Sequence, residues 1–230
     1  MTGLGAVVAA AVAFVGTHFA MSHPLRRPLV GVTGERGFLI LYSLVSFATL
    51  AWLVVAYRAA PPEAPWWTPG DALWAVATVV MLIASILLMG SLLGNPALPT
   101  GGAPGKVPDR ARGVFAVTRH PMMWSFALWA GVHVAVYPIA ANAVLCAAIA
   151  VLALVGAAMQ DRKKEQLQPV EWRAWESRTG YWPFAAIASG RASFAGFRPH
   201  DIAGGVVIWL AATWAHLPLA GWAAGVWRWI

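Results

Sequence analysis

Six long apolar stretches dominate the sequence and set the class of fold. A helix needs about 20 apolar residues to cross the hydrocarbon core of a bilayer, which is about 30 Å thick. The stretches that meet this requirement are residues 3–19, 38–57, 72–93, 122–138, 140–159 and 203–221. The chain is 60% hydrophobic and only 11% charged, which is outside the range of ordinary soluble domains. The sequence therefore predicts an all-α, polytopic membrane bundle of about six transmembrane helices, with a tight hairpin at Tyr137-Pro138.

The distribution of Lys and Arg predicts the orientation of this bundle. If the six spans alternate in direction, only Arg58 and Arg228 fall on one side, and all the other cations fall on the opposite side. Cytoplasmic connections of membrane proteins carry such an excess of cations. We therefore expect both termini outside the cell. The net charge of +7 is explained by this topology, so the expected partners are membrane lipids and no nucleic acid.

A single membrane domain is expected over residues 1–230, with a polar cytoplasmic segment at 160–201. Around Pro169 this segment is expected to form short helices that lie in the membrane interface. The side chains assigned to the interface or to lipid phosphates are Trp172, Arg173, Trp175, Arg178 and Tyr181. Two interpretations remain open at this point: a surface connector without chemistry, or a segment that forms part of a site.

Three of the six histidines, His18, His133 and His216, fall within predicted spans. An ionisable side chain inside a membrane is costly, so each of them is a functional-site hypothesis by default. The sequence has no Ser-His-Asp spacing, no HExxH motif and no expected pair of buried carboxylates, which leaves few chemistries open. His23 and His200 are expected to be ordinary surface residues in polar loops.

Helix rise predicts the depths of the three histidines. At 1.5 Å per residue, His133 lies ~21 Å above Arg119 and His216 ~22 Å above Asp201, so both are expected at the same depth in the outer half. His18 is expected nearer the cytoplasmic boundary. Two neutral imidazoles on facing helices can hold a haem iron between them. The alternative for each membrane histidine is a hydrogen bond to a backbone carbonyl.

Arg119 and His120 begin the fourth span, immediately before Pro121. Proline is tolerated at the first position of a helix, where its missing N–H costs nothing. One interpretation is a cluster that caps the helix and anchors lipid phosphates. At 100° per residue, Arg119 and His133 lie about 40° apart around the helix, whereas His120 lies about 140° from His133. His120 and His133 are therefore expected to serve different faces.

Three motifs in order resemble the NnrU family of bacterial membrane proteins. They are GTHFAMSHPLRRPLVGVTGERGF (16–38), GVFAVTRHPMMWSFALWAGVH (113–133) and DRKKEQLQPVEWRAWESRTGYWPFAAIASGR (161–191). This resemblance spans nearly the whole chain and implies a multi-pass protein of the bacterial inner membrane. The family name derives from an association with nitrite and nitric oxide reduction.

The same motifs are similar to the plant cis-zeta-carotene isomerases, membrane enzymes that contain haem b. This similarity implies that His133 is an iron ligand, with His18 as the best match to the second ligand, whereas spacing alone favours His216. It also implies a site that includes Arg119 and His120, and cis-trans isomerisation of a lipophilic polyene. Ala130 stands where the plant enzymes carry a cysteine, so a thiolate ligand is excluded at that position.

Two other functions stay open at the level of sequence. One is a non-catalytic accessory protein of nitrite and nitric oxide reduction, with redox or reductase proteins as partners. The other is an S-adenosylmethionine-dependent membrane methyltransferase, because Arg119, His120 and Pro121 also match the start of a motif in the isoprenylcysteine carboxyl methyltransferases. Met123 and Ser125 depart from the tyrosine and glycine of that motif.

Overall fold

The structure is a computed structural model that describes residues 3–98 and 107–230, and all regular secondary structure in these residues is helical. The long helices are α1 (Leu4–Ser22), α2 (Arg26–Arg58), α3 (Asp71–Ser91), α5 (Pro121–Val136), α6 (Ala140–Leu167) and α9 (Pro199–Ala220). Short elements are α4 (Val114–Val117), α7 (Pro169–Arg178), α8 (Ala185–Ala188) and the 3-10 helix η1 (Gly225–Arg228). All the long helices except α5 are long and apolar enough to cross a membrane, and α5 is a shorter apolar helix. The predicted polytopic helical bundle is confirmed.

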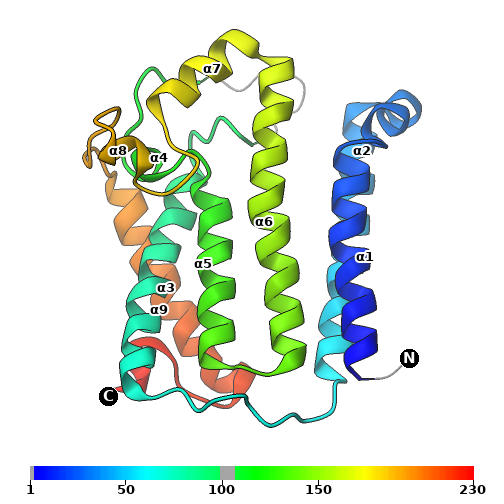
Figure 1. Cartoon of the computed structure of the whole chain (residues 1–230), viewed down its shortest axis with the longest axis vertical. Coiled ribbons are helices and arrows are strands. Elements are labelled where there is room, and N and C mark those ends of the chain that lie inside the picture. Colours follow the sequence, from blue (N-terminus) through cyan, green and yellow to red (C-terminus); the bar gives the residue numbers. More distant parts are fainter. Residues whose placement is uncertain (1–2, 99–106) are drawn as a thin grey trace.

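The long helices form a row of packed neighbours rather than a closed ring. In this row α9 packs on α3, α3 on α5, α5 on α6, α6 on α1, and α1 on α2. Figure 1 shows both chain ends at the end of the bundle opposite α7. We call the end with α4, α7 and α8 the cytoplasmic end, because the predicted topology places most of the cations there.

Helix α2 begins earlier than expected. The sequence predicts a span over residues 38–57, whereas the helix runs from Arg26 to Arg58 with a kink at Gly34. Gly34 has φ 71° and ψ 170°, a conformation that glycine adopts without the steric cost of a side chain. The polar turns before the kink therefore continue the chain as helix at the cytoplasmic end, and the turns after it cross the bundle.

The outer end confirms the predicted hairpin between α5 and α6. The Asn142 side chain donates hydrogen bonds to the carbonyl oxygens of His133 (2.8 Å) and Tyr137 (2.7 Å), each of which also accepts a backbone N–H. The Glu63 carboxylate accepts hydrogen bonds from the backbone N–H groups of Ala140 and Ala141 at the start of α6. These bonds fix the turn and the loop that precedes α3.

Small residues allow α3 and α9 to pack closely. A Cβ atom at Gly205 of α9 would lie 2.6 Å from Cγ1 and 2.7 Å from Cα of Ile86 in α3. In a bilayer the hydrophobic effect does not drive helices together, because the lipid tails are as apolar as the side chains. Helices therefore associate through close van der Waals packing of this kind. Gly205 therefore sets the distance between the two helices.

Two tryptophans at the cytoplasmic end lie in the protein core and not in the membrane interface. Trp172 and Trp175 are fully buried and pack with Leu87, Val114 and Phe115. The interfacial position predicted for them is wrong, because the apolar face of α7 covers α4 and the end of α3 instead of lipid. Arg178, expected beside lipid phosphates, donates hydrogen bonds to the carbonyl oxygens of Pro108 and Asp109.

Replacement of Gly205 by alanine tests the α3–α9 contact. We expect Gly205→Ala to destabilise the protein by about 1–3 kcal/mol, because the added methyl group meets backbone atoms that cannot move away. The matched control is Gly131→Ala in α5, where a Cβ meets nothing within 4 Å. Thermal unfolding in detergent measures both variants, and equal melting temperatures would contradict this account of the packing.

Candidate functional site

The first of three polar groupings is a buried ion-pair cluster at the cytoplasmic ends of α5 and α6. Asp161 of α6 accepts hydrogen bonds from Arg119 Nε (2.8 Å) and Arg119 Nη2 (2.6 Å) through one carboxylate oxygen. The other oxygen accepts a hydrogen bond from His120 Nε2 at 2.7 Å. His120 is only 2% exposed. The two residues that precede α5 thus share one carboxylate, and the expected contact with lipid phosphates is not the role that the structure gives them.

Helix α7 covers this cluster at the cytoplasmic end. Glu176 lies 3.2 Å from Arg119 Nη2. The Tyr181 ring packs 5.8 Å from the His120 ring, between centroids, and its hydroxyl donates to the Leu154 carbonyl oxygen. Because Arg119 and His120 are both engaged by protein carboxylates, the cluster acts as a clamp that joins α5, α6 and α7.

The sequence did not identify Asp161 and Glu176 as members of this cluster. Asp161 is buried, and both acids bind the same guanidinium. Both lie in a polar stretch that reads as solvated surface. One signal was available in the sequence. Asp161 is the first acidic residue after the apolar part of α6, and the predicted topology puts it at the same end of the bundle as Arg119.

The second grouping is a cavity of about 800 Å³ in the cytoplasmic half of the bundle. It lies between α1, α2, α5 and α6. Helices α1, α2 and α6 touch in the outer half, where Val7, Ala10, Leu53 and Ala141 are buried in one cluster. Toward the cytoplasm the α1–α2 pair separates from α6, as Figure 1 shows. The residues that line the cavity from the four helices include Phe14, His18, Phe19, Phe38, Tyr42, Phe126, Leu152 and Gly156.

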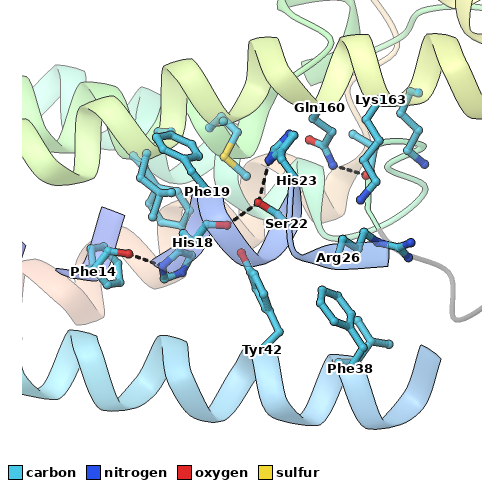
Figure 2. A pocket seen from close by; sticks show the side chains of 18 of the residues that line it. Phe14, His18, Phe19, Ser22, His23, Arg26, Phe38, Tyr42, Gln160 and Lys163 are labelled. Atoms are coloured by element: carbon cyan, nitrogen blue, oxygen red, sulfur yellow. Dashed lines mark hydrogen bonds between the residues drawn. The ribbon is translucent and has the colours of Figure 1, made fainter. Parts of the chain in front are cut away.

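His18 is the predicted site residue that lines this cavity. Its Nδ1 lies 2.7 Å from the Phe14 carbonyl oxygen one turn earlier. A carbonyl only accepts, so Nδ1 carries the proton and Nε2 of the neutral ring keeps a lone pair. Tyr42 of α2 packs edge-on at 5.5 Å between ring centroids, and Figure 2 shows its side chain reaching from α2 toward α1. His18 is thus positioned as a potential metal ligand beside a phenol.

The third grouping is the pair formed by His133 and His216. Their ring centroids are 6.0 Å apart, which agrees with the equal depths that helix rise predicts. Each Nδ1 lies 2.8 Å from a carbonyl oxygen one turn earlier, that of Trp129 and that of Ala212, respectively. Neither histidine lines the cavity that contains His18. The structure therefore brings together His133 with His216 and Arg119 with His120, and it places His18 apart from both pairs.

The arrangement of apolar helices defines the chain as a multi-pass helical membrane protein. The model of the family described as NnrU protein matches residues 6–224, and the chain belongs to this family. Searches of curated proteins and of solved structures found no match. The resemblance expected from the three motifs is confirmed at the level of the family.

Replacement of Asp161 tests the clamp. We expect Asp161→Asn to lower the free energy of unfolding by about 3 kcal/mol, because the buried Arg119 guanidinium loses its closer carboxylate partner and keeps only the more exposed Glu176. The control is Glu171→Gln, which makes the same change at an exposed position of α7 and should change stability by less than about 0.5 kcal/mol. Denaturation in mixed micelles measures both, and a similar loss in the two variants would contradict the assignment.

The shifted pKa of Glu176 predicts that the stability of the folded protein depends on pH. Burial raises the pKa of Glu176 from its ordinary value near 4.5 to about 7; Arg119 opposes this rise, and the carboxyl groups of Glu165 and Asp161 add to it. A carboxyl group whose pKa is raised by folding stabilises the fold below its unfolded pKa, and that contribution is lost as the pH rises through the folded value.

The test is the melting temperature of Glu176→Gln relative to the wild type. As the pH rises from about 4.5 to about 7, we expect the difference to shift in favour of the variant, because glutamine does not ionise. A difference that stays constant over this range would show that the carboxyl group titrates normally in the folded protein.

Proposed function

We propose that this NnrU-family protein binds haem b in the cavity between α1, α2, α5 and α6, with His18 as an axial ligand. One observation carries the proposal: a histidine with a free Nε2 lone pair faces a large, mostly apolar cavity inside a membrane bundle. The bacterial inner membrane is the proposed location. A lipophilic polyene is the proposed substrate class, with cis-trans isomerisation as the reaction.

The residues present fit such a group. Ligand pockets in proteins measure about 300–1,000 Å³ and combine apolar walls with a few polar groups, and the cavity of about 800 Å³ lies within this range. Its walls carry Phe14, Phe19 and Phe38, which suit a flat aromatic macrocycle. The hydrogen bond from His18 Nδ1 to a carbonyl fixes the ring orientation and raises the basicity of the other nitrogen, as is usual for a histidine that binds metal.

The protein side chains would hold and shield the group, and the group would supply one-electron redox chemistry. His18 would hold the iron through Nε2. Tyr42 lies next to His18 and can donate a hydrogen bond into the same space. The apolar wall from α6, which includes Leu152 and Gly156, excludes water. A lipid-soluble substrate matches these walls better than a polar one does.

The other predicted ligands have a different place in this proposal. His133 and His216 face one another on α5 and α9, so iron bound between them would lie outside the cavity. We assign the iron ligand to His18 because, of the three histidines in the predicted spans, His18 is the one that lines a cavity of the required size in the described part of the chain. The methyltransferase alternative is not carried forward, because Arg119 and His120 are occupied by Asp161.

The absorption spectrum of the purified protein with added haem tests the proposal. We expect a Soret band for the wild type and loss or a shift of that band in His18→Ala, because the iron loses its protein ligand. His216→Ala is the matched control, since His216 also donates Nδ1–H to a carbonyl one turn earlier but does not line the cavity. No Soret band, or a band altered only in His216→Ala and His133→Ala, would overturn the assignment.

A further inference from the structure

The cytoplasmic mouth of the cavity carries charges that the binding of an iron atom by His18 would not require. Three cations, Arg26, Lys163 and Lys164, and one carboxylate, Glu35, line this part of the wall. The mouth therefore has an excess of two positive charges. Figure 2 shows Arg26 and Lys163 on the same side of the cavity, away from Phe14 and His18.

These cations differ in how far the protein already satisfies them. Arg26 Nη2 binds Glu35 at 2.8 Å, across the kink of α2. Lys164 Nζ donates to the Pro96 carbonyl oxygen at 2.9 Å and lies over the Trp172 ring. Lys163 makes no hydrogen bond or ion pair with any residue that the structure describes, although its side chain is half-buried. Lys163 is thus the cation with the most free donor capacity at the mouth.

A second polar group at the mouth also lacks a partner. His23 Nε2 is buried and has no hydrogen-bond partner among residues 3–98 and 107–230, while His23 Nδ1 contacts the Ser22 hydroxyl. A buried polar atom without a partner costs free energy unless a ligand or water satisfies it. The Ser22 hydroxyl gives its proton to the His18 carbonyl, so His23 Nδ1 donates to Ser22 and the unsatisfied Nε2 of the neutral ring is an acceptor. The free ammonium of Lys163 in the same wall is therefore the group that favours a ligand with anionic groups at this end.

We infer that the mouth binds the carboxylates of the cavity's occupant, with Lys163 as the main determinant of specificity. The inference rests on the proposed function, because haem b carries two ionised propionates, which match the excess of two positive charges. Charge-assisted hydrogen bonds to carboxylates are the strongest class that Lys offers. The occupant therefore lies with its ionised edge toward the cytoplasm and its apolar body against α1, α2 and α6.

The test compares ferric haem b with its dimethyl ester, which has the same macrocycle and iron but no carboxylates. Dissociation constants for both are measured by spectral titration of the full-length protein in detergent. The wild type should bind haem b about tenfold more tightly than the ester. Lys163→Gln should lower this preference to below about threefold, and Lys163→Arg should keep it because the charge remains.

Arg162→Gln is the matched control, since Arg162 is the exposed neighbour of Lys163 and does not line the cavity. It should retain the tenfold preference. Unequal partition of the two porphyrins into detergent multiplies the ratio of their dissociation constants by the same factor in every variant, so it cancels when the ratios of two variants are compared. A ratio that is the same in Lys163→Gln and Arg162→Gln overturns the inference.

Different experimental results would contradict the role of the mouth and the proposed haem site. Suppose that His18→Ala weakens the binding of both porphyrins equally, while Lys163→Gln leaves the ratio of their dissociation constants unchanged. The proposed haem site then stands, and the role inferred for the mouth is wrong. If the wild type binds neither porphyrin, both are overturned. A thermal melt of Lys163→Gln close to that of Arg162→Gln shows that the comparison concerns binding and not folding.

Discussion

The bonds that Arg119 and His120 make to Asp161 hold the cytoplasmic half of the molecule together. They fix the start of α5 to the end of α6, and Glu176 brings α7 onto the same guanidinium. Buried charges are tolerated only when they are paired and hydrogen-bonded, so the helices have little freedom to slide past one another here. Since α6 provides one wall of the cavity, the shape of the proposed site depends on this clamp.

The other walls of the cavity depend on how the α1–α2 pair packs against α6. Small side chains such as Ala10 and Ala141 bring the helices together in the outer half. In the cytoplasmic half the aromatic residues Phe38 and Tyr42 of α2 line the space that results, which has His18 in its wall and cations at its mouth. An apolar space with one ligand and one charged end suits an amphiphilic cofactor. The membership of the NnrU family leaves this chemistry open, and the site supplies the argument for it.

Much of the fold follows from the sequence because a bilayer imposes a length and a polarity on each span. The spans, the hairpin before Ala140 and the shared depth of His133 and His216 could all be predicted in this way. The partners of Arg119 and His120 could not, since helix rise gives depth but does not tell which helix face meets which neighbour. Trp172 and Trp175 were misplaced for a related reason: an amphipathic helix has the same pattern on a membrane surface as on a protein core.

The candidate site shows the same limit. The histidines could be identified as unusual from their position in apolar spans, but the cavity arises from the divergence of α1 and α2 from α6, which no local pattern encodes. Lys163 and Tyr42 gain their significance only from that space.

The position of the iron tests the central claim most directly. In crystals of the haem-loaded protein, data collected at the iron absorption edge locate the metal independently of the protein phases. The account predicts an anomalous peak within bonding distance of His18 Nε2, inside the cavity between α1, α2, α5 and α6. A peak between His133 and His216 would contradict it.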